Sequence, residues 1–156
     1  MGDLITKEGS ITFLKLKMPP TVNKAYVNVN KRRFLSQSGK LFKQDVKAKV
    51  AELSLDCTET FWLDCEPLKL ICEFYFPTLE NKGWSTGKAK TRYKRIDVSN
   101  RVKLLEDAVS EGLDIDDLYF FQLILIKRED KESDEPYVNV TIERNDVGKL
   151  FHVCED

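Results

Sequence analysis

The chain has 156 residues, of which 42% are hydrophobic and 33% charged, and its formal net charge is −1. This size suits one globular domain with a single core, so we expect residues 1–156 to form one domain with a flexible acidic C-terminal tail at about 145–156. A run of 18 apolar residues is absent, as are the basic start and apolar stretch of a signal peptide, so we expect a soluble, cytoplasmic protein with no membrane partner.

The N-terminal third predicts a strand, a short hairpin and a helix. Apolar and polar residues partly alternate over residues 11–17, which favours a strand that stops at the Pro19-Pro20 pair. Residues 21–36 are interpreted as a loop with a short hairpin. Ser36 or Ser38 is placed to cap a helix that runs to about Leu53, because apolar residues recur there with helical spacing.

The middle of the chain predicts a strand and a long loop. An acidic, irregular connection at 56–66 leads to a strand at 67–77. Every second residue of that strand is apolar, which predicts one buried face formed by Leu68, Leu70, Cys72, Phe74 and Phe76. The loop at 78–95 is unusually long for a compact domain, and loops of this length are usually functional or disordered.

The C-terminal part predicts a second helix from about residue 97, then a strand at 118–127, an acidic turn at 128–136 and a final strand at 137–144. The complete order is therefore strand, helix, strand, helix, strand, strand. This order predicts an α+β fold, in which two main helices pack on one face of a mixed β-sheet.

The net charge conceals two basic segments. Residues 15–49 hold ten Lys or Arg and a single acid, Asp45, while residues 82–95 hold six Lys or Arg and no acid. These segments carry +15, so the remainder carries −16. Separated charge attracts polyanions even when the net charge is small. One such segment is typical of a solvated face, but two that flank an acidic cluster favour nucleic acid as the partner.

Cysteine and histidine usage excludes several kinds of site. The chain has four cysteines, at positions 8, 7 and 82 residues apart, and they form no CxxC pair, which argues against a zinc site or a disulfide framework: Cys57, Cys65, Cys72 and Cys154. We expect reduced thiols, with Cys72 in the core. The single histidine, His152, lies in the tail, which argues against a histidine triad or a multi-histidine metal site. Any catalytic or metal site must therefore be formed by carboxylates, lysines and hydroxyls.

Residues 95–117, RIDVSNRVKLLEDAVSEGLDIDD, carry carboxylates at both ends and a lysine in the middle. On a helical wheel, Val98, Val102, Leu105 and Val109 share one stripe, and the opposite side holds Asn100, Lys103 and Asp107, with Asp97 adjacent. Each feature also has a non-functional interpretation. The polar stripe is compatible with plain solvent exposure, and Asp97 or Ser99 with a helix N-cap. The LDIDD segment is compatible with a solvated turn.

The position of Asp116 and Asp117, directly before an apolar strand, favours a functional interpretation. Clustered carboxylates raise one another's pKa unless a cation lies between them. Magnesium takes hard oxygen ligands and is held by one or two carboxylates together with substrate phosphates. It lowers the pKa of a bound water, while a lysine neutralises charge on the phosphate. Several acids, one lysine and two basic segments therefore indicate metal-assisted phosphodiester hydrolysis.

At these residues the sequence resembles the RusA family of Holliday-junction endonucleases. The family pattern is Asp-x-Asp-Asn, a lysine three positions after the Asn, an Asp-Ala pair and a later Asp-Asp ahead of a strand, and the residues that match are Asp97, Asn100, Lys103, Asp107, Ala108, Asp116 and Asp117. The segment PPTVNKAY resembles the family's Pro-Pro-Ser-x-Asn segment, with Asn23 in the matching place. The similarity extends from about residue 11 to residue 144.

The resemblance implies a RusA-like nuclease domain: a homodimeric, Mg²⁺-dependent endonuclease, with Mn²⁺ as a substitute, that nicks two opposed strands of a four-way DNA junction in recombination and repair. It implies Asp97, Lys103 and Asp117 as catalytic residues and Asp97, Asp117, Asp116 and Ser99 as the metal site. The residues expected to contact nucleic acid are Asn23, Lys31, Arg32, Arg33, Lys88, Lys90, Arg92, Lys94, Arg95 and Asn100.

One departure from the family pattern is Ser99, which stands where the second Asp is usual and removes one negative charge. Either a neighbouring acid (Asp116, Asp114 or Glu73) replaces it, or a water bound by Ser99 does, or activity is reduced. The rival hypothesis is therefore a branched-DNA-binding protein of the same fold with little or no catalysis. A phosphohydrolase acting on small nucleotides is a third, although GWSTGK lacks the spacing of a phosphate-binding loop.

A symmetric cut requires two active sites, so we expect a dimer. Phe120, Leu123 and Leu125 are candidate interface residues, although we expect these three to be buried in the core. The second candidate pair is Val29 and Phe34 in the hairpin.

Overall fold

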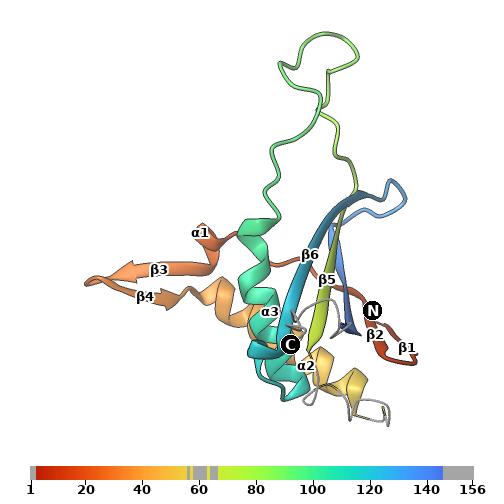
Figure 1. Cartoon of the computed structure of the whole chain (residues 1–156). Helices are drawn as coiled ribbons and strands as arrows, with labels where there is room; N and C mark the ends of the chain where they lie inside the picture. The colour runs from red at the N-terminus through yellow and green to blue at the C-terminus, as the bar shows by residue number, and fades with distance from the viewer. Residues whose placement is uncertain (1–2, 56, 58–62, 64–66, 146–156) are drawn as a thin grey trace, which may run out of the picture.

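The structure, a computed structural model, describes residues 3–55, 57, 63 and 67–145. Two long helices lie against a twisted sheet, while a short hairpin and a long loop project from this body in different directions (Figure 1). The elements in chain order are β1 (Asp3–Lys7), β2 (Ser10–Lys17), α1 (Val22–Ala25), β3 (Tyr26–Val29), β4 (Arg32–Leu35), α2 (Gln37–Ser54), β5 (Leu68–Phe76), α3 (Ser99–Leu113), the 3-10 turn η2 (Asp117–Tyr119), β6 (Phe120–Glu129) and β7 (Tyr137–Arg144).

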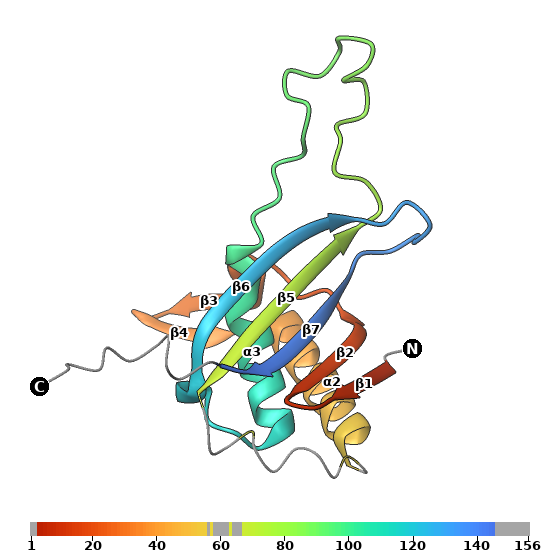
Figure 2. The same ribbon diagram turned by 45° about the vertical axis from the view of Figure 1, so that its right-hand side comes forward.

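The main sheet has five strands in the order β1-β2-β7-β5-β6, and β3 and β4 form a separate two-stranded hairpin. β5 and β6 are parallel, whereas the other pairs in the main sheet are antiparallel. A parallel pair requires a long crossover connection, and the chain supplies it through the long loop and α3. The predicted α+β fold with a mixed sheet and two main helices is confirmed, and Figure 2 shows both helices on the same face of the sheet.

The hydrophobic core lies between that face and the helices. Burial alternates strictly along β5, as the sequence predicted, and Leu68, Leu70, Cys72 and Phe74 are fully buried. Burial raises the pKa of the Cys72 thiol to about 12, with a smaller contribution from the Glu106 carboxylate. A thiol with so high a pKa stays protonated and unreactive, in agreement with the predicted place of Cys72 in the core.

The helix α2 begins where the sequence predicted. The Ser36 hydroxyl accepts a hydrogen bond from the Gly39 amide at 3.1 Å and donates one to the Lys24 carbonyl at 2.5 Å. A Cβ on Gly39 would lie 2.4 Å from the Ala25 carbonyl oxygen. The absence of a side chain at Gly39 therefore lets α1 approach α2, which fixes the base of the β3–β4 hairpin against the body.

The helix α3 buries the predicted apolar stripe. Val102, Leu105 and Val109 are buried and Val98 packs at the edge of the core, while Leu104 and Ala108 widen the buried face. Near its C-terminal end, a Cβ on Gly112 would meet the Lys47 carbonyl oxygen and the Val50 side chain at 2.9 Å. The packing of α2 against α3 therefore depends on glycine at this position.

The strand β6 lies at an edge of the sheet and is more exposed than the sequence suggested. Phe120 and Leu125 pack partly against the core, but Leu123 is 45% exposed and Ile124 is 39% exposed. The expected core burial of Leu123 is therefore wrong. The physical reason is that an edge strand has a neighbour on one side only, so an apolar run there is covered less completely than the same run in a central strand.

Two predicted segments fall largely or wholly outside the described residues. In the connection at 56–66 the structure describes Cys57 and the buried Leu63, and the tail at 146–156, including His152, is not described. Within the described part of the chain, no helix is both long and apolar enough to span a bilayer.

Candidate active site and nucleic-acid interface

Asp97 and Ser99 form a turn at the start of α3, called here the Asp97 turn. The Asp97 carboxylate accepts hydrogen bonds from the Ser99 hydroxyl at 2.5 Å and from the Ser99 amide at 3.0 Å. The Ser99 hydroxyl lowers the pKa of Asp97, and the amides of Ser99 and Asn100 contribute in the same direction. Asp97 therefore satisfies the free amides of the first helical turn and stays ionised, while its exposed position leaves it accessible to a ligand.

Lys103 lies on the exposed face of α3 and joins two carboxylates. Its Nζ is 2.9 Å from the Asp107 carboxylate and 3.2 Å from the Asp117 carboxylate. The hydrogen bond with Asp107, and then that with Asp117, raises the pKa of Lys103, so the side chain remains a cation. This contact is the point at which α3 meets the segment that enters β6.

Glu106 completes a group called here the Lys103 cluster, which consists of Lys103, Glu106, Asp107 and Asp117. Burial raises the pKa of Glu106; Lys103 lowers it, and Asp117 and Asp107 raise it further. Two carboxylates thus contact one ammonium group, and a third carboxyl group, that of Glu106, interacts with it electrostatically. Such a cluster carries an excess of negative charge and favours a further cation.

Asp116 and Asp117 have different local roles. The Asp116 carboxylate accepts a hydrogen bond from the Leu118 amide at 3.0 Å and caps η2, whereas Asp117 turns toward Lys103. An open acidic cavity of about 470 Å³ adjoins this segment, and its acidic lining consists of Asp107, Glu111, Asp114, Asp116 and Asp117.

The structure shows direct contacts between predicted metal-site residues in two places. Ser99 contacts Asp97, and Asp116 adjoins Asp117, but no hydrogen bond or ion pair among the described residues links the pairs. Lys103 lies one helical turn after Ser99, about 6 Å along α3, and its side chain forms the ion pair with Asp117. Within the described ranges, no group of three or more His, Cys, Asp or Glu side chains is arranged to hold a metal.

The donor chemistry of each pair nevertheless suits Mg²⁺, because carboxylate and hydroxyl oxygens are hard ligands and Mg²⁺ needs few of them from the protein. Two of the acids considered as substitutes for Ser99 lie elsewhere. Glu73 pairs with Arg128, and its side chain lies on the sheet face away from the helices. Asp114 ends α3, at the opposite end from Ser99.

The loop at 79–95, called here the arm, projects far from the body and is held by hydrogen bonds across its base (Figures 1 and 2). The Asn81 side chain donates to the Thr91 carbonyl at 2.7 Å and to the Tyr93 carbonyl at 3.1 Å, and Arg92 pairs with Glu80 at 2.6 Å. The predicted cations on the arm are exposed or half-buried: Lys88, Lys90, Arg92, Lys94 and Arg95. These cations therefore lie on a loop whose two strands are joined by hydrogen bonds.

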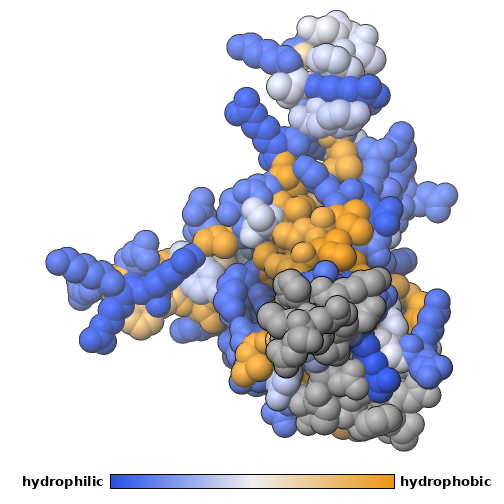
Figure 3. All heavy atoms as spheres, viewed as in Figure 1, coloured by the Kyte–Doolittle hydropathy of each residue, from blue (hydrophilic) through white to orange (hydrophobic). Residues whose placement is uncertain are grey.

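The β3–β4 hairpin forms the second basic projection. Its turn uses Asn30 and Lys31 with φ of 49° and 63°, as two-residue hairpin turns require. Lys31, Arg32 and Arg33 are exposed, and Arg33 lies over the Tyr26 ring at 4.2 Å. Figure 3 shows hydrophilic residues along both projections, and Figures 1 and 2 place the start of α3 between their bases. Two basic surfaces thus diverge from the region of the Asp97 turn.

The remaining predicted contacts, Asn23 on α1 and Asn100 on α3, are also exposed. Sequence reasoning did not select Asp107 or Glu106 as site residues, although both contribute to the electrostatics of Lys103. Their spacing was the available signal, because residues three and four positions from Lys103 share its helix face.

A mixed sheet carries a helix crossover whose exposed face presents a lysine among carboxylates, between two basic projections. This combination of charges suits a protein that acts on a polyanion such as DNA. The profile of the family Endodeoxyribonuclease RusA matches residues 17–143. The chain therefore belongs to the RusA family of endodeoxyribonucleases, whose members resolve Holliday junctions. No curated protein matches the chain.

Proposed function

We propose that this chain is a Mg²⁺-dependent, structure-selective endonuclease that resolves four-way DNA junctions by phosphodiester hydrolysis, with Mn²⁺ as a substitute. The observation that carries the proposal is the contact of Lys103, on α3 between two basic projections, with Asp107 and with Asp117 of η2, in a chain of the RusA family. The test is incubation with a labelled four-way junction, a matched duplex and a single strand, each with and without Mg²⁺.

We assign Asp97 and Asp117 as the principal metal ligands, with Ser99 and Asp116 beside them. A bound Mg²⁺ would supply an activated water and stabilise charge in the transition state. Lys103 is already protonated, so its ammonium group is available to a substrate phosphate without a proton transfer. Asp107 keeps the Lys103 side chain on the exposed face of α3 through an ion pair at four-residue spacing.

We assign the arm and the hairpin to the DNA backbone. Their cations neutralise phosphates and place the duplex arms of a junction on either side of α3, because contacts to phosphates fix position without reading sequence. Asn23 and Asn100 have the hydrogen-bonding groups to contact the sugar-phosphate backbone near the Asp97 turn.

A second function, junction binding with weak or no cleavage, is favoured by one specific observation. Ser99 supplies no charge where the family has an acid, and its hydroxyl donates a hydrogen bond to Asp97. Junction-selective binding without cleavage in Mg²⁺ or Mn²⁺ would establish this function instead. Cleavage of free nucleotides would indicate a small-molecule phosphohydrolase.

Substitution of Ser99 by aspartate tests how the departure from the family pattern affects catalysis. The Ser99 hydroxyl now donates to Asp97, so a carboxylate at this position would face another carboxylate and bind a cation between them. We expect Ser99→Asp to cleave faster than the wild type at limiting Mg²⁺. Cleavage rate against Mg²⁺ concentration measures this, with Ser99→Ala as the control for loss of the hydroxyl; a mutant that needs more Mg²⁺ would refute the assignment of Ser99.

Homodimerisation through the β6 edge is the further part of the proposal. Leu118, Leu123 and Ile124 are 61%, 45% and 39% exposed on or beside this edge, and Figure 3 shows an apolar patch in the same region of the molecule. A long apolar edge strand is a template for pairing with a second strand. Pairing two copies across a twofold axis would bury this edge and supply the two active sites that a symmetric cut requires.

We expect Leu123→Glu to shift the protein from dimer to monomer at micromolar concentration and to abolish paired nicking. Ile5→Glu is the matched control, because Ile5 is 44% exposed on β1, the opposite edge of the same sheet. Light scattering and the ratio of paired to single nicks measure the two effects. A wild-type monomer with full junction cleavage would refute dimerisation, and equal behaviour of the two variants would exclude β6 as the interface.

A further inference from the structure

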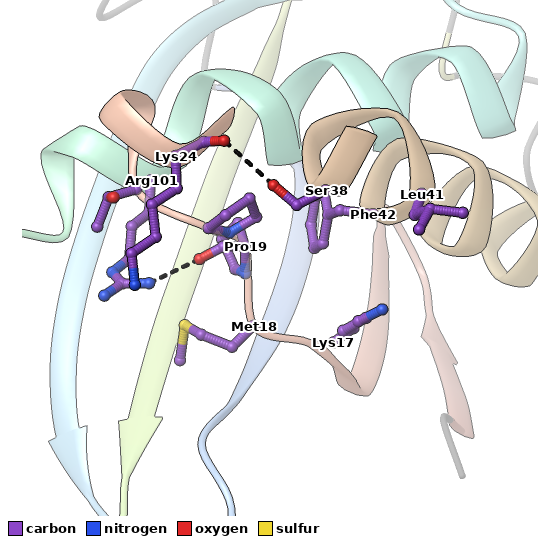
Figure 4. A pocket seen from close by; sticks show the side chains of 10 residues that line it. Lys17, Met18, Pro19, Lys24, Ser38, Leu41, Phe42 and Arg101 are labelled. Carbon is purple, nitrogen blue, oxygen red and sulfur yellow. Dashed lines mark hydrogen bonds between the residues drawn. The ribbon is translucent and has the colours of Figure 1, made fainter. Parts of the chain in front are cut away.

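A basic pocket beside the first turn of α3 contains no residue of the Lys103 cluster and has no role in the proposed catalysis (Figure 4). It is a cavity of about 350 Å³ between the segment that follows β2, the helix α1 and the first turns of α2 and α3. Three of the ten lining residues are cations, Lys17, Lys24 and Arg101, and none is acidic. Its apolar lining includes Met18, Leu41 and Phe42.

Arg101 is the group whose bonding is incomplete. Its Nη1 donates to the Pro19 carbonyl at 2.7 Å, but its Nε is buried and has no hydrogen-bond partner. No carboxylate among the described residues forms a salt bridge with Arg101, and burial lowers the pKa of its guanidinium. By contrast, Arg92 and Arg128 each pair with a glutamate. A partly buried cation with an unsatisfied donor costs free energy until an anion approaches it.

The arrangement of charge in the pocket indicates the shape of that anion. Figure 4 shows Lys24 and Arg101 at one end of the pocket and Lys17 at the other, with apolar side chains between them. Lys17 is already paired with Asp45 at 3.0 Å, so the end formed by Lys24 and Arg101 carries the uncompensated charge. A suitable ligand has an anionic group at this end and an apolar ring or sugar beside it.

We infer that the pocket binds a nucleoside phosphate, with the phosphate on Arg101 and Lys24 and the sugar or base over Met18 and Leu41. Phosphate supplies several acceptor oxygens and matches the fork of a guanidinium group, whereas the apolar lining gives no partner to a bare inorganic ion. The source of the ligand is either a free nucleotide or one nucleotide of an unpaired DNA strand. The inference does not depend on cleavage, because none of these residues belongs to the Lys103 cluster or the Asp97 turn.

The experiment is titration of the ¹⁵N-labelled full chain, followed by NMR, with deoxythymidine monophosphate, thymidine, inorganic phosphate and a four-nucleotide strand of thymidine. We expect saturable binding of the monophosphate, at least about 10-fold weaker binding of thymidine and of inorganic phosphate, and a loss of about 10-fold in affinity in Arg101→Gln. Lys24→Gln is a second variant at an exposed position, and it keeps the test valid if Arg101→Gln fails to fold. Lys40→Gln, an exposed cation of α2 outside the pocket lining, is the matched control and should bind as the wild type does.

Tighter binding of the four-nucleotide strand than of the monophosphate would assign the pocket to DNA, and the reverse order would assign it to a free nucleotide. Either order supports the inference if Lys24→Gln weakens binding of the ligand that binds more tightly. Unchanged affinity in both Arg101→Gln and Lys24→Gln, or equal binding of thymidine, would overturn it. Because the readout is binding without Mg²⁺, a failure of junction cleavage leaves the result interpretable.

Discussion

Replacing Asp117 by asparagine is expected to reduce the rate of junction cleavage by about 10²- to 10³-fold, the usual loss when one preorganised electrostatic group of an active site is removed. Asparagine keeps the size of the side chain but removes the charge that a metal requires and the ion pair with Lys103. DNA affinity should stay the same or rise, because one negative charge near the phosphates is lost. Single-turnover cleavage of a labelled junction and binding in Ca²⁺ measure the two effects.

Asp97→Asn should lose activity to a similar extent if both pairs of ligands serve the same reaction. Asp114→Asn is the matched control, because Asp114 lines the same acidic cavity as Asp117 and has a φ of 56°, a conformation that asparagine adopts readily. Full activity in this control would show that the cavity's overall charge is not the cause. Retained cleavage in both Asp97→Asn and Asp117→Asn would place the active site elsewhere.

The parts of the fold that could be predicted are those that local periodicity determines. The alternation along β5, the apolar stripe of α3 and the serine cap of α2 each depend on residues close together in sequence. β1 could not be predicted, because its five residues are mostly exposed and become a strand through pairing with β2 across a turn at Gly9. α1 is a single helical turn, held by contacts with α2 rather than by its own pattern.

The sequence predicts which site residues share one face of α3, but it does not predict which level along the α3 axis the residues from other segments contact. A helical wheel places Lys103 and Asp107 on one face, and the structure joins them at 2.9 Å. The wheel does not show how far the entry to β6 lies along α3, which depends on the crossover from β5 to β6 and on the path after Leu113. Asp117 consequently meets Lys103 rather than Asp97. Arg101 was overlooked for a similar reason, because its environment is formed by segments distant in sequence.

The exposure of Leu123 shows the corresponding limit for strands. The apolar run in β6 predicts burial, yet the sequence of a strand does not reveal whether that strand is central or at an edge. The order β1-β2-β7-β5-β6 places β6 at the edge, and this position converts an expected core residue into a candidate contact between copies.

Neutralising the hairpin cations is expected to have the second large effect. Each phosphate contact contributes about 0.9 to the slope of log affinity against log salt, so Lys31→Gln, Arg32→Gln and Arg33→Gln together should reduce the slope by about 2.7. With equal affinities of the two proteins at 1 M salt, the variant at 0.1 M salt binds DNA about 500-fold more weakly than the wild type. All DNA shapes should lose affinity alike, because phosphate contacts do not distinguish shape or sequence directly.

The arm offers an independent triple of the same kind, Lys88, Lys90 and Arg95, for which we expect a similar change of slope. The control removes the same charge from lysines that already pair with glutamates on the body, namely Lys49, Lys69 and Lys131. Fluorescence anisotropy from 0.05 to 0.5 M salt measures all three variants. If the control lost as much as the projections, net charge alone would govern binding; a wild-type affinity independent of salt would mean that both projections are solvated surfaces. A reduced slope confined to the two projections would instead establish them as the surfaces that hold the DNA on either side of α3.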